Sequence, residues 1–177
     1  MKYLTKPLWR EAQEFGEENR RQWNLALEEY RAQLATLQPR LTADAYKFYD
    51  EGDLHDGELL ELRVIDGSRP ASLSEAPRPW QTRRDYPITV SLSVLDARDQ
   101  FVWHVSYRSL RRVVIDFPTD EPTFFQEGEG FGDLGYHELT DAGNGFLRHE
   151  VLFASGAVLL FEFKDIAVTC NLWRLAI

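Results

Sequence analysis

FLRHEVLFASGAVLLFEFK, residues 146–164, is the part of the chain that predicts the architecture most directly. Two apolar-rich runs, Phe146–Ala154 and Ala157–Lys164, lie on either side of a short turn. Such turns join neighbouring antiparallel strands, and a glycine such as Gly156 readily takes the left-handed conformation that closes a three-residue loop. The stretch therefore predicts a β-hairpin.

The register of this hairpin follows from the side chains that must meet. A loop of residues 154–156 places Arg148 opposite Glu162, so one face carries an ion pair. The other face carries large apolar side chains together with His149. Its apolar members are Leu147, Val151, Phe153, Leu159, Phe161 and Phe163. We expect this apolar face to form the core and helices to cover it.

Alternation of apolar and polar residues, which is typical of half-buried strands, recurs through much of the chain. It occurs in Leu59–Val64, Ile88–Leu95, Phe101–Tyr107, Val113–Phe117, Tyr136–Leu139 and Ala167–Leu172. The short polar link Asp96–Gln100 predicts that the segments beside it form an antiparallel hairpin. Long loops are expected at 66–87 and 118–135, where the alternation stops.

Residues 1–52 have a helical period instead. Apolar residues from Leu8 to Leu37 are spaced alternately by threes and fours, and Gly16 is a point where this helix breaks or bends. Pro39 ends the helix, and Thr42 can cap a short second one. The patterns predict a single α+β domain over 1–177, with N-terminal helices on one face of a mainly antiparallel, meander-like sheet over 58–177. That sheet is expected to contain about six or seven strands.

The composition excludes several classes of partner. A net charge of −9 disfavours nucleic acid and anionic membranes, because both recruit concentrated Lys and Arg. Cys170 is the single cysteine, so no intrachain disulfide can form and nothing marks an oxidising compartment. No signal-peptide pattern and no apolar run of about 20 residues is present. We expect a cytoplasmic protein.

An acidic stretch from Val113 to Leu147 holds eight Asp and Glu residues and no Lys or Arg. Its central part interleaves carboxylates with Phe side chains, so it can offer apolar contact area and negative potential together. The candidate binding residues are Asp120, Glu121, Phe124, Phe125, Glu127, Glu129, Phe131 and Asp133. This pattern indicates a surface for a basic protein partner. An ordinary solvated loop, balanced by Arg108, Arg111 and Arg112, would explain the same residues.

Signals for cofactors and metals are weak in this chain. Gly130–Gly135 has the letters GxGxxG of a dinucleotide-binding loop, but strand-like sequence follows it and nearby carboxylates would repel phosphate. The four histidines and one cysteine lack the spacing of a zinc site. No cofactor and no metal are therefore expected.

Catalytic candidates are limited to His55, Asp56 and His149. His55 and Asp56 could form a base with an orienting carboxylate, although a turn at Asp56-Gly57 explains them more simply. His149 and Glu150 are adjacent in a strand, so they point to opposite faces and cannot act on one substrate atom.

Several short pieces resemble a bacterial family of unknown function. They are MKYLTK at 1–6, LHDG at 54–57, HEVLF at 149–153 and FEFKDI at 161–166. This resemblance implies no activity. In size, charge and order of helices and strands the chain is also similar to immunity proteins that neutralise secreted toxins, which implies a protein-binding role.

Two hypotheses follow from the sequence. The first is a non-enzymatic, immunity-like binding protein that recognises a basic protein through the acidic loop. The alternative is an enzyme of unassigned class, with a pocket between helices and sheet that uses His55, Asp56 or His149.

Overall fold

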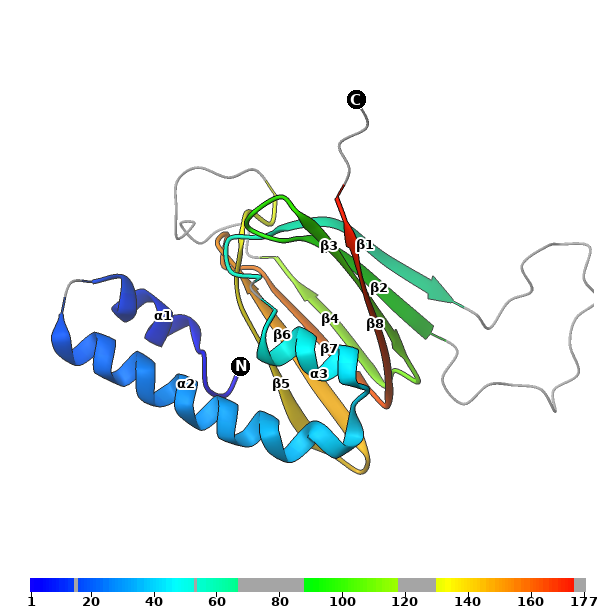
Figure 1. Cartoon of the computed structure of the whole chain (residues 1–177), viewed down its shortest axis with the longest axis horizontal. Coiled ribbons are helices and arrows are strands. Elements are labelled where there is room, and N and C mark those ends of the chain that lie inside the picture. The colour runs from blue at the N-terminus through cyan, green and yellow to red at the C-terminus, as the bar shows by residue number, and fades with distance from the viewer. Residues whose placement is uncertain (15, 53, 67–87, 118–129, 174–177) are drawn as a thin grey trace, which may run out of the picture.

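The computed structural model describes residues 1–14, 16–52, 54–66, 88–117 and 130–173. This part of the chain contains three α-helices, a short 3-10 helix and eight strands (Figure 1). The helices are α1 (Lys6–Gln13), α2 (Glu17–Leu37), η1 (Gln38–Arg40) and α3 (Ala43–Asp50). The strands are β1 (Glu58–Asp66), β2 (Ile88–Leu95), β3 (Phe101–Arg108), β4 (Arg112–Asp116), β5 (Leu134–Gly143), β6 (Phe146–Phe153), β7 (Val158–Phe163) and β8 (Asp165–Leu172).

The described strands form two four-stranded sheets, ordered β1-β2-β3-β8 and β4-β7-β6-β5. All of their pairings are antiparallel, so the expected α+β class with antiparallel strands is confirmed. The expectation of one meander sheet with six or seven strands is wrong. The chain changes sheet over residues 109–111, between β3 and β4, and again at Lys164, between β7 and β8. Because these links are so short, the sequence pattern predicts one continuous meander and does not show where the chain changes sheet.

The β6–β7 hairpin has the register that its side chains predict. Arg148 pairs with Glu162 across the ladder, and Gly156 closes the turn with φ 83°. His149 faces inward with 1% of its surface exposed. Most of the apolar side chains on that face are fully buried, and each such burial contributes about 1.5–3 kcal/mol.

The two sheets share a core that is rich in aromatic rings. Tyr107 of β3 stacks on Phe161 of β7, with ring centroids 4.7 Å apart, and its ring also lies 5.0 Å from Phe163. Because side chains alternate along each strand, every second residue of β3 and β7 reaches this core. The inner faces of the two sheets therefore pack against each other.

The helices cover an edge of the sandwich rather than one face of a single sheet, which corrects the sequence-based expectation. The helix breaks at Gly16 as anticipated, and the Thr42 hydroxyl caps α3 by accepting a hydrogen bond from the Ala45 N–H at 3.2 Å. α2 packs beside β5, and α3 packs against both β5 and β8 (Figure 1). Phe48 of α3 reaches Trp103 in one sheet and His137 in the other, with centroid distances of 5.4 and 5.2 Å. None of the described helices combines the length and apolar character needed to span a membrane.

The first residues of the chain are held against β5 and β6 by two carboxylates. Glu138, which has no exposed surface, accepts hydrogen bonds from the backbone N–H groups of Lys2, Tyr3 and Leu4. The Met1 amine forms an ion pair with Glu150 at 2.6 Å. A buried carboxylate is costly unless donors surround it, and here three consecutive N–H groups do so.

Replacing Glu138 by Gln tests this arrangement. The amide turns one acceptor oxygen into a donor that faces backbone N–H groups, so we expect the free energy of unfolding to fall by about 2 kcal/mol or more. Urea denaturation monitored by circular dichroism measures the change. Glu28→Gln, at an exposed helical position, is the matched control and should change stability by less than about 0.5 kcal/mol. Equal stability of the two variants would contradict the role of Glu138.

Candidate functional site

Only two of the eight predicted binding residues fall within the described part of the chain. The six that lie outside it are Asp120, Glu121, Phe124, Phe125, Glu127 and Glu129. Phe131 is partly buried and packs against the Phe153 ring at a centroid distance of 5.0 Å. Asp133 is exposed, and its backbone carbonyl accepts a hydrogen bond from the Ala154 N–H at 2.8 Å. Phe131 thus anchors the end of the acidic segment, whereas the side chain of Asp133 faces solvent.

The two ends of the acidic segment meet at one place on the sandwich. The chain leaves the described part after Phe117 and returns at Gly130, and the rings of Phe117 and Phe131 make an edge contact at 5.4 Å. Residues 118–129 number twelve. The described ends of the acidic segment therefore meet beside Phe117.

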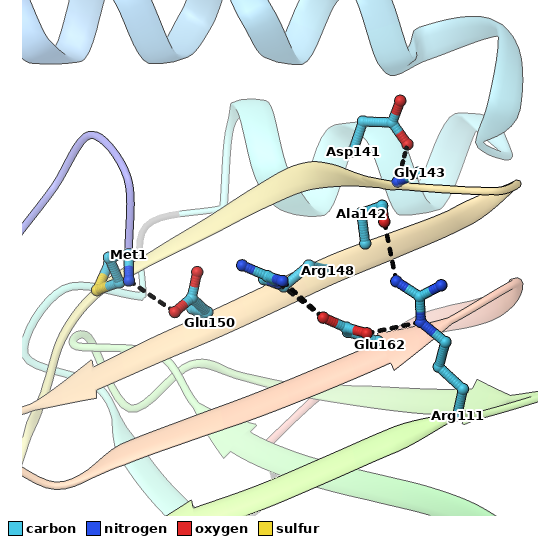
Figure 2. A network of polar contacts seen from close by, with 8 residues as sticks. All are labelled: Met1, Arg111, Asp141, Ala142, Gly143, Arg148, Glu150 and Glu162. Atoms are coloured by element: carbon cyan, nitrogen blue, oxygen red, sulfur yellow. Dashed lines mark hydrogen bonds and ion pairs between the residues drawn. The ribbon is translucent and has the colours of Figure 1, made fainter.

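The basic residues that precede the acidic segment are partly committed to another contact. Arg111 donates through Nε to Glu162 at 2.6 Å and through its terminal nitrogen to the Ala142 carbonyl at 2.8 Å (Figure 2). Arg148 binds the other oxygen of the same carboxylate at 2.7 Å. Burial alone would raise the pKa of Glu162, but the hydrogen bonds and charges of the two arginines outweigh it and hold that pKa below its usual range. Arg111 is therefore engaged on the outer face of the β4-β7-β6-β5 sheet.

A polar pocket of about 320 Å³ lies next to this network. The N-terminal residues, Gln33 of α2 and residues of β5 and β6, including Arg148 and Glu150, line it. On one side of the pocket Asp141 accepts a hydrogen bond from the Gly143 N–H (Figure 2). Asp141 also pairs with Arg40 at 2.9 Å. Sequence reasoning missed this pocket because its residues are far apart in the chain. The paired outer positions Arg148 and Glu162 were the one local signal that this face carries charge.

A buried polar chain runs between the sheets beside α3. The Tyr107 hydroxyl lies 2.5 Å from Nδ1 of His149, and Nε2 of His149 lies 3.1 Å from Nδ1 of His137. A hydroxyl that donates to Nδ1 leaves the Nε2–H of His149 to donate to His137. The Tyr49 ring packs edge-on against His149 at 4.9 Å. Both ring nitrogens of His149 are thus satisfied inside the core.

Burial keeps this chain uncharged. It lowers the pKa of His137 to about 4, and burial together with the neighbouring His137 lowers the pKa of His149 well below its usual value. Burial also raises the pKa of the Tyr49 and Tyr107 hydroxyls. All four groups are therefore neutral near pH 7, which is typical of a structural polar network.

The three catalytic candidates do not converge. His55 contacts Asp56, with Nδ1 and Oδ1 3.0 Å apart, and its ring packs edge-on against Tyr136 at 4.6 Å. Tyr136 and His137 are neighbours in β5, so they point to opposite faces of the sheet, and His149 is bonded to His137. Asp56 occupies a left-handed turn with φ 61°. The structure places the His55–Asp56 pair outside the sheet and His149 inside the core.

The glycines at 130–135 serve the turn into β5. Gly132 has φ 67°, and strand β5 starts directly afterwards at Leu134, where a dinucleotide-binding loop requires a helix. Gly135 leaves room for Trp9, because a Cβ atom there would lie 2.5 Å from the indole ring. Over the described residues, no group of three or more His, Cys, Asp or Glu side chains is arranged to hold a metal ion. Cys170 lies exposed in β8.

Comparisons with models of known protein families, with curated proteins and with solved structures found no match. They neither confirm nor contradict the resemblance noted in the sequence. A functional conclusion for this chain therefore rests on its own geometry and charge.

The buried histidines predict a pH dependence of stability. Between about pH 6.5, the usual value of an unfolded histidine, and the folded value of about 4 for His137, the unfolded chain binds protons that the folded chain does not. The free energy of unfolding should therefore fall as the pH falls through this range, by about 1 kcal/mol per pH unit for each such histidine. His137→Gln should reduce this slope, and His104→Gln, at an exposed position of β3, should not. Denaturant titrations at pH 6.5 and 5.0 measure the slopes, and an unchanged slope in His137→Gln would refute the assignment.

The network around Glu162 predicts a second effect on stability. Glu162→Gln removes the charge that two arginines share inside a largely buried contact, so we expect a loss of about 2 kcal/mol in the free energy of unfolding. Glu18→Gln breaks an exposed ion pair with Arg21 and should leave the free energy of unfolding nearly unchanged, because solvent screens that pair. Urea denaturation measures both changes in the free energy of unfolding. Urea is used because guanidinium is a salt and would screen the exposed ion pair. Similar changes in the free energy of unfolding in the two variants would show that Glu162 contributes no more to stability than an exposed ion pair does.

Proposed function

We propose that this chain is a non-enzymatic binding protein that recognises a basic protein partner through the acidic segment Asp120–Asp133. The contact between Phe117 and Phe131 carries the proposal, because it brings both ends of that segment to one spot. The role resembles that of an immunity protein, and we place it in the bacterial cytoplasm, as the single cysteine and the sequence resemblance suggest.

Charge and exposed apolar area support this proposal together. The sequence of the segment carries five carboxylates within a chain of net charge −9, and its described ends meet at Phe117 and Phe131. Phe117 is 41% exposed, so apolar surface lies at the base of the segment. Negative potential accelerates encounter with a basic partner, while an apolar side chain that becomes desolvated at the interface supplies most of the affinity.

The enzyme alternative has no comparable support. His149 is enclosed and fully hydrogen-bonded, and His55 lies on the other side of the sheet. A general acid–base site needs its groups within hydrogen-bond reach of one substrate atom. These residues offer no such position.

The binding proposal is tested with a partner captured from the source cells and then purified. In the site variant, Asp120, Glu121, Glu127 and Glu129 are changed to Asn or Gln. We expect its Kd to rise at least about tenfold and its salt dependence to flatten, because four attractive charges are lost. Calorimetry at low and raised salt measures both quantities.

A matched control neutralises four exposed acidic residues of the helical part, Glu14, Glu17, Glu28 and Glu29. It changes the net charge equally but leaves the acidic segment intact, so its Kd should stay within about threefold of the original. Equal effects of the two quadruple variants would show that net charge, not the segment, determines binding. Binding that is indifferent to both would refute the proposal.

A further inference from the structure

Strand β4 is an edge strand with no described neighbour on its outer side. It pairs with β7 alone, and its ladder from Arg112 to Asp116 is regular. An edge of this kind presents a row of backbone N–H and C=O groups that can pair with another strand. Natural proteins usually block such edges with bulges, covering elements or charges that point inward.

The other described edges carry such protection. β1 has a bulge between Leu59 and Glu61. Gly57, the residue just before β1, forms a β-bridge with Leu134. β5 is covered by α2, whose Tyr30 hydroxyl accepts a hydrogen bond from the Leu139 N–H at 3.2 Å. β8 packs against α3. Of the edges in the described part of the chain, β4 is the one with neither a bulge nor a described element packed over it.

Two copies of β4 placed side by side in opposite directions have complementary side chains. Arg112, Val114 and Asp116 share one face of the strand, and Val113 and Ile115 share the other. In an antiparallel pair centred on Val114, each Arg112 lies opposite Asp116 of the second copy, and each Val113 lies opposite Ile115. Opposite charges and β-branched side chains are both favourable cross-strand pairs.

The charged residues of β4 are free to make this contact. Arg112 and Asp116 are exposed, and neither forms an ion pair with another described residue. Glu162 lies opposite Arg112 in the ladder but is bound to Arg111 and Arg148 instead. Ile115 keeps about half of its surface exposed although it points to the inner side of the sheet. A second strand beside β4 would cover it.

We propose that two copies of this chain associate through β4, in antiparallel register about a two-fold axis at Val114. The two β4-β7-β6-β5 sheets then join into one continuous sheet of eight strands. The contact is isologous, so one surface serves both copies and the assembly closes as a dimer. This proposal does not depend on the binding role of the acidic segment.

Charge exchange tests the register. Arg112→Asp and Asp116→Arg each turn two attractive pairs into repulsive ones, so each should raise the dimer dissociation constant by about tenfold or more. The double variant restores opposite charges across the axis and should return the constant to within about threefold of the original. Sedimentation velocity over a dilution series measures it, and far-ultraviolet circular dichroism verifies that every variant is folded.

Arg63→Asp is the matched control, because Arg63 is an exposed residue of the same charge on the protected edge β1. It should leave dimerisation unchanged. A protein that is monomeric throughout the dilution series, a double variant that fails to restore association, or a loss caused by Arg63→Asp would each overturn the proposal.

A cross-link provides a test that does not rely on charge. In a Cys170→Ser background, Val114→Cys places two thiols opposite each other on the axis, where Cβ atoms of paired residues lie about 4.5–5.5 Å apart. Mild oxidation should convert this variant to a covalent dimer. Thr169→Cys in the same background, an exposed position on β8, should stay monomeric under the same treatment. Equal cross-linking of both variants would contradict pairing through β4.

Discussion

The register of the β6–β7 hairpin is the constraint on which the rest of the structure depends. Side chains in a strand alternate between two faces, so a slip of one residue would exchange the faces completely. Arg148 and Glu162 would then enter the core, and His149 would leave it. The ion pair on one face and the aromatic packing on the other favour the same register, which makes the alternative very costly. The neighbouring strands β4 and β5 inherit their orientation from this hairpin.

The outer face of that sheet is unusual because it buries carboxylates. Glu138, Glu150 and Glu162 are all buried, and each has its own donors. Glu138 binds backbone N–H groups, and Glu150 binds the Met1 amine. Glu162 binds the guanidinium groups of two arginines. A buried carboxylate without such donors would protonate or destabilise the fold. The N-terminal segment is thus part of the structure of this face and not an appendage to it.

Local chemistry made much of the fold predictable. The hairpin register, the Gly156 turn, the Thr42 cap and the inward position of His149 all follow from residues that are close in the sequence. The division into two sheets was not predictable, because the chain crosses between them through links of three residues and one residue that carry no turn signal. The carboxylate contacts of the N-terminus were also missed. They join residues about 135 positions apart, and periodicity in the sequence contains no information at that range.

The candidate site was predictable only in part, for a similar reason. The acidic composition of the segment was visible in the sequence, but the role of individual aromatic residues was not. Phe131 was expected to offer contact area to a partner, and its partly buried ring packs against Phe153 and Phe117. Phe117, which lay outside the predicted set, is the more exposed of the pair. The packing of the sandwich, which the sequence does not show, distinguishes the two rings.

The closure formed by Phe117 and Phe131 has a consequence for how this protein can evolve. Since both ends of the segment are fixed to the sandwich, insertions and deletions between them leave the strands in place, and doubling the length of a loop costs only about 0.6 kcal/mol in closure entropy. The fold thus offers a place where the length of the chain can change while the strands keep their positions.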